Sequence, residues 1–269
     1  MEITKSQLNQ FDQVGFFKMD RVISRKGFQE IRERMEDITQ GRIQYPGMSF
    51  QLDGSSKAYD SVPRGGGFQG PSDNYRKIQG WEKDPVFLKY MQHKIFRDLT
   101  QKLIGDKVSI YRAMFMNKPP QSGTNLPYHQ DGGAGWGLSS YLANQFVTVW
   151  TAIDNAYVES GCIQVVPGSH KLGLLSDQGH TITEEQVKEY ASEEKSAYLE
   201  AQMGEIFVLH NFLLHKSGIN QTNKPRRGFS VCYMDGTITR VNTSEDTGVI
   251  NPNYEFPIMF GENAMKAAV

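Results

Sequence analysis

The N-terminal residues have the apolar spacing of two amphipathic helices. Thr4 and Gln7 have the spacing of a capping box, and we expect the helix that they begin to end by Gly15. The apolar residues at 16–19 favour a short strand. Over residues 25–39 apolar side chains recur every three or four positions, which predicts a second helix with one face on the core.

Residues 40–80 show no such period. The segment contains Pro46, Pro63, Pro71 and eight glycines, which are typical of turns and loops. In a compact domain, a stretch of this length without a pattern is usually functional or disordered. We therefore predict that it forms a mobile cover over the functional site, and a surface loop without a role is the alternative.

A further helix and a series of strands are predicted after residue 80. Asp84 and Pro85 begin a helical pattern that runs to about residue 104. Beyond it the period changes to two, and Thr183 begins one polar helix within the β region. The strand candidates are residues 108–115, 146–153, 162–166, 205–210 and 229–233. This order predicts a mainly β chain, an antiparallel barrel or sandwich with flanking helices.

Composition fits one domain. A chain of 269 residues with 38% hydrophobic content can bury a sizeable core. We expect a single domain over residues 1–269, with a helical part at about 1–105 and a β core at about 106–240.

Charge and apolar runs argue against several classes of protein. The net charge is −1 and the pI about 6.6, so no overall field would attract nucleic acid or an anionic membrane. The apolar runs are too short to span a membrane, and the N-terminus has no apolar signal-peptide core. Cys162 and Cys232 are the only cysteines, too few for a disulfide framework. We expect a cytoplasmic protein that binds a small molecule; the sequence does not indicate its oligomeric state.

Three residues have the pattern of a metal site. His129 and Asp131 are two positions apart, so on an extended segment both side chains point to one face. His215 lies 84 residues after Asp131 and can join them from a later strand. Two imidazoles and one carboxylate on one side of a metal form the facial triad of non-haem Fe(II) oxygenases. His210 competes for the third position, but it lies within a predicted strand, and we favour His215 at the strand's far end.

Arg226 is the candidate for binding a carboxylate. It precedes a predicted strand, and a guanidinium held there can grip a carboxylate with two parallel hydrogen bonds. An oxygenase that uses 2-oxoglutarate needs such a group for the distal carboxylate, and the Ser217 hydroxyl can add a donor. Arg226 and Arg227 are neighbours on opposite faces of the strand, and we choose Arg226 as the one that points inward.

Substrate contacts are predicted in two segments. The glycine-rich residues 132–137 lack the spacing of a dinucleotide-binding loop, so we reject phosphate binding there and expect Trp136 near the substrate or in the core. Basic and aromatic side chains of residues 40–80 can bind a polar or anionic small molecule. They are Arg64, Arg76 and Lys77 with Tyr45, Phe50 and Tyr59.

An ordered set of motifs is similar to the phytanoyl-CoA dioxygenase (PhyH) family of Fe(II)- and 2-oxoglutarate-dependent oxygenases. The motifs are Lys118-Pro119-Pro120, Tyr128-His129-Gln130-Asp131, Trp150 to Asn155, Glu159 to Cys162, Val166 to His170, and His215 to Asn220 with Arg226. The resemblance covers nearly the whole chain. It implies a double-stranded β-helix (jelly-roll, cupin-like) core and an oxidoreductase that uses Fe(II), 2-oxoglutarate and O2.

The resemblance also assigns roles to residues. It implies that His129, Asp131 and His215 are the catalytic metal ligands and that Arg226 and Ser217 bind 2-oxoglutarate, and we add Gln130 and Lys118 to the cofactor-binding residues. The expected substrate contacts are Trp136, Met114, Trp150, Arg64 and Phe50. Related halogenases lack the carboxylate ligand, so Asp131 argues against halogenation.

The implied reaction is the oxidation of an unactivated C–H bond of a metabolite or natural-product intermediate, with release of succinate and CO2. Hydroxylation is expected, and desaturation, cyclisation or demethylation are variants of it. Two other hypotheses stay open from the residues. One is a cupin-like metal hydrolase or lyase, and the other is a non-catalytic metabolite-binding protein on the same fold.

Overall fold

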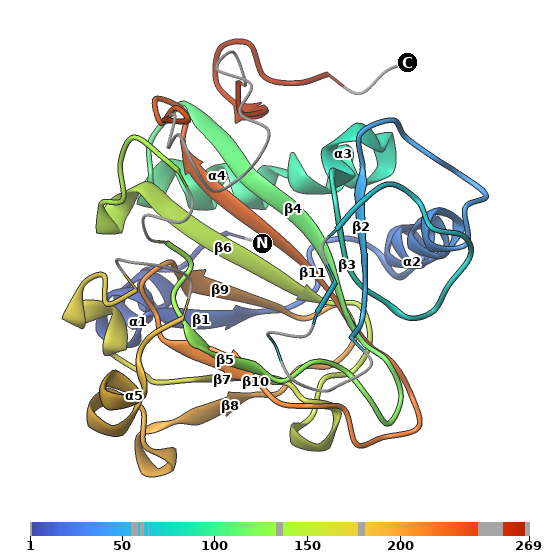
Figure 1. Cartoon of the computed structure of the whole chain (residues 1–269). Coiled ribbons are helices and arrows are strands. Elements are labelled where there is room, and N and C mark those ends of the chain that lie inside the picture. The colour runs from blue at the N-terminus through green and yellow to red at the C-terminus, as the bar shows by residue number, and fades with distance from the viewer. Residues whose placement is uncertain are drawn as a thin grey trace.

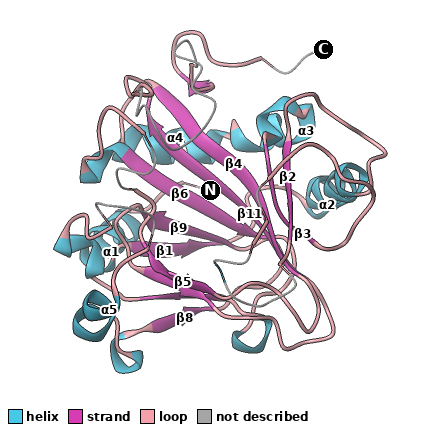
Figure 2. Cartoon of the chain, viewed as in Figure 1, coloured by secondary structure: helices cyan, strands magenta, loops and turns pink. Residues whose placement is uncertain are grey.

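The structure is a computed structural model that describes residues 2–54, 59, 62–63, 65–132, 137–176, 181–241 and 255–266. Two antiparallel β-sheets lie at its centre, and helices lie outside them (Figures 1 and 2). Among the described residues the larger sheet has eight strands and the smaller one four. A mainly β fold with flanking helices, as predicted from the pattern, is confirmed.

Each sheet combines segments that are distant in the sequence. The larger sheet has the order β1 (Phe16–Met19), β9 (Ile206–His210), β6 (Phe146–Ala152), β11 (Arg226–Asp235), β4 (Val108–Lys118), β3 (Tyr75–Gln79) and β2 (Ser49–Leu52), and β12 (Ile258–Phe260) pairs with β4. The smaller sheet has the order β5 (Leu126–His129), β10 (His215–Ser217), β7 (Ile163–Val165) and β8 (Ala197–Leu199).

The helices begin where the sequence provides caps. They are α1 (Lys5–Val14), α2 (Arg25–Thr39), α3 (Pro85–Met91), α4 (Lys94–Leu103) and α5 (Glu184–Tyr190). Thr4 and Gln7 form the predicted capping box of α1, and Gly15 ends the helix with a φ of 86°. The helix predicted from Asp84 to about residue 104 is in fact two, because the His93 side chain accepts the Ile95 amide hydrogen and caps a new helix.

Residues 40–80, predicted to form a cover rich in loops, contain two strands that the sequence pattern did not indicate. β2 and β3 lie within the segment and extend the larger sheet beyond β4. Phe50, Tyr75 and Ile78 are buried in the core, which anchors both strands. The segment therefore contributes sheet structure as well as connections.

The two faces of the larger sheet differ. The Phe115 and Phe229 side chains pack with Trp81 and Phe87 from the helical side in the main hydrophobic core. Because neighbouring residues of a strand face opposite sides, the residues adjacent to Phe115 and Phe229 face the smaller sheet. In the part of the chain that the structure describes, no helix is long and apolar enough to cross a membrane.

Candidate active site

The smaller sheet brings the two histidines of the predicted triad together. β5 and β10 are antiparallel neighbours, and His129 and His215 are register partners, with ring centroids 4.0 Å apart. Asp131 follows two residues after His129. One ligand atom from each of the three residues lies within 4.8 Å of the others, and all three residues are buried or nearly so. The structure thus assembles the triad that the spacing predicts.

Backbone contacts fix the orientation of both rings. Nδ1 of His129 donates to the Pro127 carbonyl at 2.9 Å, and Nδ1 of His215 donates to the Leu213 carbonyl at 2.8 Å. A carbonyl oxygen only accepts, so each Nδ1 carries the hydrogen in these contacts. A neutral imidazole of this tautomer presents Nε2 as the basic nitrogen, which is the form that ligates metals.

The Asp131 carboxylate is held at both oxygens. Arg112 Nη2 lies 2.6 Å from Oδ1, and the Thr148 hydroxyl donates to Oδ2 at 2.9 Å. Arg112 comes from β4 and Thr148 from β6, so the larger sheet positions an acid that follows a strand of the smaller sheet. A carboxylate fixed in this way is preorganised to ligate a cation.

His210, the competing histidine, lies elsewhere. It ends β9, and its ring centroid is 4.8 Å from that of His170 and 5.6 Å from that of Phe11. Burial and the nearby His170 lower the pKa of His210 to about 4. Its surroundings are those of a packed structural residue, so the preference for His215 agrees with the structure.

A cavity of about 390 Å³ opens between the two sheets beside the triad. Its volume lies in the range of small-molecule sites. Even-numbered positions of β4, β6 and β11 line it, because strand alternation turns them away from the helical core. They are Arg112, Met114, Met116 and Lys118 of β4, Thr148 and Trp150 of β6, and Arg226 and Ser230 of β11.

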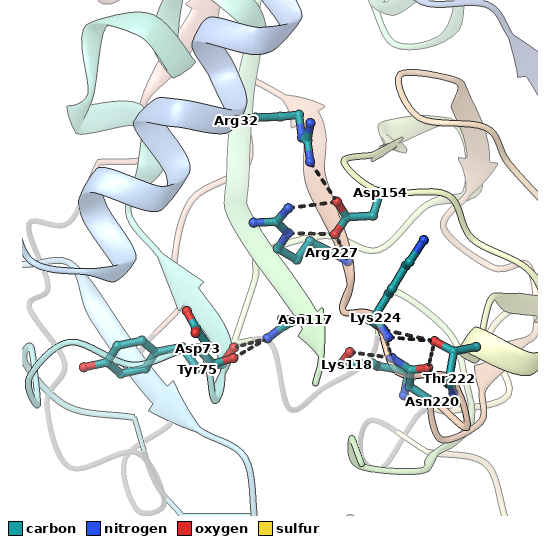
Figure 3. Close-up of polar contacts among 10 residues, drawn as sticks. All are labelled: Arg32, Asp73, Tyr75, Asn117, Lys118, Asp154, Asn220, Thr222, Lys224 and Arg227. Carbon is teal, nitrogen blue, oxygen red and sulfur yellow. Dashed lines mark hydrogen bonds and ion pairs between the residues drawn. The ribbon is translucent and has the colours of Figure 1, made fainter. Parts of the chain in front are cut away.

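Arg226 and Arg227 face opposite sides of β11. Arg226 is 2% exposed, lines the cavity, and donates from Nη2 to the Gly161 carbonyl at 2.6 Å. Its Nε has no hydrogen-bond partner among the described residues, and burial lowers the pKa of the guanidinium to about 10. Arg227 instead binds both oxygens of Asp154, at 2.7 and 2.8 Å, with Arg32 alongside (Figure 3).

Lys118 also lines the cavity, opposite Arg226 in the β4–β11 register. Its Nζ donates to the Thr124 carbonyl at 2.6 Å and lies 3.4 Å from the Ser217 carbonyl. Burial and the nearby Arg226 lower the pKa of Lys118 well below its usual range. The Asn220 side chain donates to the Lys118 carbonyl at 2.9 Å and so ties this end of β4 to the turn before β11 (Figure 3).

Gly161 allows the Gly218 carbonyl and the Lys118 side chain to lie close to its backbone at this end of the cavity. A Cβ atom there would lie 2.5 Å from the Gly218 carbonyl oxygen and 3.0 Å from Lys118, and the φ of 71° already favours glycine. Close packing therefore explains the glycine of the Glu159-Ser160-Gly161 motif. Ser217, the residue before Gly218, is buried and lines the cavity.

Gln130 does not lie in the cavity lining. Its fully buried amide donates to the carbonyls of Gly173 and Phe212 and accepts the amide hydrogens of Leu175 and Ser176. All of its hydrogen-bonding capacity serves the loops that surround the triad. This position makes Gln130 a structural brace beside the triad, whereas the sequence favoured a cofactor contact.

The expected substrate contacts separate into three groups. Met114 and Trp150 line the cavity, as do Tyr59, Arg76 and Lys77 of the 40–80 segment. Phe50 is 3% exposed and packs against Phe68 and Tyr75 in the core, so a substrate contact is wrong for it, and the Tyr45 hydroxyl donates to Asp84. Arg64 and Trp136 lie outside the described residues.

Several lining residues were missed in the sequence. They include Gln79, Tyr111, Arg112, Thr148 and Arg240. Arg112 and Thr148 carried a local signal, because Arg112 shares strand parity with Met114 and Thr148 shares it with Trp150. The others need the tertiary fold to be recognised.

Comparison with known proteins shows similarity to one protein family. A model of the family described as phytanoyl-CoA dioxygenase (PhyH) matches residues 11–228. A probable phytanoyl-CoA dioxygenase of Caenorhabditis elegans is 25% identical over 91% of this chain and 80% of its own length. The peroxisomal phytanoyl-CoA dioxygenase of Bos taurus is 24% identical over 84% of this chain and 66% of its own length.

Solved structures share the fold. The non-haem α-ketoglutarate-dependent carbocyclase SnoK from nogalamycin biosynthesis matches with a TM-score of 0.69, at 20% identity over 91% of this chain and 88% of that one. EctD from S. alaskensis, solved with 2-oxoglutarate and 5-hydroxyectoine, matches with a TM-score of 0.70, at 18% identity over 87% of this chain and 77% of that one. These matches confirm the jelly-roll fold implied by the sequence motifs.

The family model covers most of the chain, and the three residues that the family needs for iron converge in the structure. The cofactors are accordingly Fe(II) and 2-oxoglutarate, and the hypotheses of a metal hydrolase and of a non-catalytic binding protein lose their support. The chain belongs to the phytanoyl-CoA dioxygenase family of Fe(II)- and 2-oxoglutarate-dependent oxygenases.

Proposed function

We propose that this chain oxidises an unactivated C–H bond of a small molecule, a metabolite or natural-product intermediate, with release of succinate and CO2. The observation that carries the proposal is a buried guanidinium, Arg226, in the same cavity as the His129, Asp131 and His215 cluster. A cavity of about 390 Å³ suits a small molecule better than a polymer.

The residues fit the groups that the family uses. Two imidazoles and one carboxylate suit Fe(II) and leave coordination positions open on one side. The Arg226 Nε has no partner among the described residues, and a carboxylate would satisfy it. Fe(II), 2-oxoglutarate and O2 together would supply the oxidising power.

The protein's own side chains would bind the metal and 2-oxoglutarate and orient the substrate. His129, Asp131 and His215 would hold the metal, with Arg112 and Thr148 fixing the carboxylate. Arg226 would grip the distal carboxylate of 2-oxoglutarate, with the Ser217 hydroxyl and the Lys118 amino group adding donors. The apolar faces of Met114 and Trp150 would exclude water and position the substrate.

Hydroxylation is the simplest outcome. Desaturation, cyclisation and demethylation differ from it in how the substrate is held beside the metal. The solved relatives of this fold include a carbocyclase and an epimerase, so the fold alone does not favour one outcome.

An anaerobic titration tests the proposal. Fe(II) followed by 2-oxoglutarate should give the weak visible charge-transfer band of the bidentate chelate, and His215→Ala should abolish it. Arg226→Ala should raise the 2-oxoglutarate concentration at half-maximal band by roughly tenfold to a hundredfold, as expected for a lost charge-assisted pair.

Arg227→Ala is the matched control, since that side chain faces Asp154 on the other side of the strand. It should leave the titration unchanged. If Fe(II) binds but no band forms, the cosubstrate assignment fails and a metal hydrolase becomes the better hypothesis. If Arg227→Ala has the larger effect, Arg226 is not the carboxylate anchor.

A further inference from the structure

The cavity is far more positive than the chain as a whole. Seven of the described side chains that line it are basic and one, Asp131, is acidic, whereas the net charge of the chain is −1. Lys216 is offset by an ion pair with Glu193, which lies outside the lining. Among the described residues, the lining therefore has more basic side chains than Arg226 and Lys118, the two that are assigned to 2-oxoglutarate.

The basic side chains lie in two parts of the cavity. Arg226 opposes Lys118 at one end of the β4–β11 pair, and Arg112, opposite Cys232 within the pair, marks what we call the Arg112 end of the cavity. Lys118 and Arg112 are six positions apart on β4, which corresponds to about 20 Å along a strand. The Arg226 end is assigned above to the distal carboxylate of 2-oxoglutarate, which leaves the Arg112 end of the cavity for a second ligand.

Aromatic rings position two guanidiniums at the Arg112 end. The Arg112 guanidinium lies 5.7 Å from the Tyr111 ring centroid, and the Arg240 guanidinium lies 5.4 Å from that of Phe256. The Tyr111 and Phe256 rings are themselves 5.9 Å apart. Both arginines line the cavity, so this end presents two planar donors of hydrogen bonds supported by aromatic faces.

Lys77 adds a third positive group from β3. Burial, together with the nearby Arg112 and Arg76, lowers the pKa of Lys77 to about 8. Like charges in a buried cavity repel one another, and an anion that enters relieves the repulsion.

We propose that the Arg112 end of the cavity is the primary-substrate site and that the substrate carries an oxyanion, a carboxylate or a phosphate, which binds Arg112 and Arg240. The inference rests on the proposed function, because it takes the Arg226 end as occupied by 2-oxoglutarate. A guanidinium has five N–H donors, so the contact of Arg112 with Asp131 is compatible with a second oxyanion.

The contact between Arg112 and Asp131 also indicates which C–H bond of the substrate is oxidised. Arg112 lies 2.6 Å from a carboxylate that is assigned to the metal. An oxyanion bound to Arg112 is therefore close to the metal, and the C–H bond that is oxidised lies close to the substrate's anionic group.

Matched acids and amides test the inference. With Fe(II) and saturating 2-oxoglutarate bound anaerobically, benzoate and hexanoate are compared with benzamide and hexanamide, and inorganic phosphate is the third probe. Binding is measured by calorimetry and by the change in the chelate band, at constant ionic strength. The acids, or phosphate, should bind at least about tenfold more tightly than the amides, because charged pairs in a desolvated site dominate such discrimination.

Charge removal at the site gives the decisive comparison. Arg240→Gln should remove the preference for the anion while leaving Fe(II) affinity unchanged, since Asp131 pairs with Arg112. Arg112→Gln should remove the preference too and also weaken Fe(II) binding. Arg42→Gln, at an exposed arginine paired with Asp37, is the control and should bind the probes like the wild type.

The outcomes separate this inference from the proposed function. A chelate band without a preference for acids or phosphate, or a preference that survives Arg240→Gln, overturns the oxyanion site and leaves the proposed function intact. A tenfold rise in the 2-oxoglutarate midpoint in Arg240→Gln overturns it as well, because the group would then serve the cosubstrate. A preference without any chelate band supports the anion site and removes the proposed function. A preference for phosphate over both carboxylates identifies a phosphate ester as the source of the oxyanion.

Discussion

Gly228 determines where the Trp150 ring lies in the cavity. The two residues are on the neighbouring strands β11 and β6, and a Cβ atom on Gly228 would lie 2.5 Å from Trp150 Cζ2. The ring therefore packs directly on backbone. The Arg226 guanidinium lies 5.9 Å from the centroid of this ring, so the glycine also affects the proposed carboxylate anchor.

Gly228→Ala should destabilise the protein and weaken 2-oxoglutarate binding together. The added methyl group must displace the ring, and overpacking of this kind costs roughly 1–3 kcal/mol. Urea unfolding and the chelate-band titration measure the two effects. Gly67→Ala is the control, because a Cβ atom there meets nothing within 4 Å. Equal stability of the two variants would contradict this view of the Trp150 packing.

Asp131→Ala should abolish turnover and lower Fe(II) affinity. Its carboxylate is the acidic member of the described triad, and its loss should exceed the roughly 10- to 100-fold cost of losing an outer-shell partner. Metal affinity measured by calorimetry gives a result independent of activity. Asp37→Ala removes an exposed acid for comparison. Full turnover in Asp131→Ala would contradict the assignment of the triad.

At the scale of elements, Asp84 connects two helices. It is fully buried and caps α3 by accepting the amide hydrogens of Val86 and Phe87. The same carboxylate accepts the Tyr45 hydroxyl at 2.9 Å and pairs with Arg34 of α2 at 3.2 Å. One side chain thus satisfies a helix N-terminus and links α2 to α3.

Asp84→Ala should lower the free energy of unfolding by roughly 3 kcal/mol, since it removes a cap and leaves buried partners without their acceptor. Thr183→Ala, which removes the cap of the exposed helix α5, should cost only about 1 kcal/mol. Chemical denaturation of both variants makes the comparison. A loss at Asp84 no larger than at Thr183 would show that the link between α2 and α3 contributes little.

Elements with local signals were predictable from the sequence, and β3 shows why others were not. The caps at Thr4 and Thr183 act within one turn and the apolar period of residues 25–39 is local, so the sequence alone indicated α1, α2 and α5. In β3, only Tyr75 and Ile78 are fully buried, and the other three residues, Arg76, Lys77 and Gln79, are polar and line the cavity. A strand whose polar side serves a site lacks the alternation that identifies strands.

The candidate site was predictable only in part, because some of its signals are local in the sequence and others depend on the tertiary fold. The spacing of His129 and Asp131 and the strand parity of Arg226 are local, so the triad and its anchor could be predicted. The contact of Arg112 with Asp131 and the position of Arg240 depend on how the two sheets face each other. Such contacts between distant strands leave no periodic trace in the sequence.

At the scale of the whole molecule, a histidine pair lies where α1 meets the strands. His170 Nε2 contacts the Asp12 carbonyl at the end of α1, and its ring is 4.8 Å from that of His210 on β9. A Cβ atom on Gly15 would lie 2.7 Å from His170 Nδ1, so α1 ends directly against this pair. The packing of the N-terminal helix on the sheet therefore involves two packed imidazoles, and burial lowers the pKa of both.

The stability of the whole chain should fall in mild acid for this reason. Burial lowers the pKa of His210 to about 4 from 6.5, so below about pH 6.5 the unfolded chain binds more protons than the folded one. The contribution of His210 is fully present above pH 6.5 and should be lost, by roughly 2 kcal/mol, as the pH falls towards 4. Urea unfolding at pH 7, 6 and 5 measures the slope. His210→Asn keeps an acceptor for the Phe212 amide hydrogen but does not titrate, so its slope should be shallower. Equal slopes for the variant and the wild type would show that acid acts through other groups.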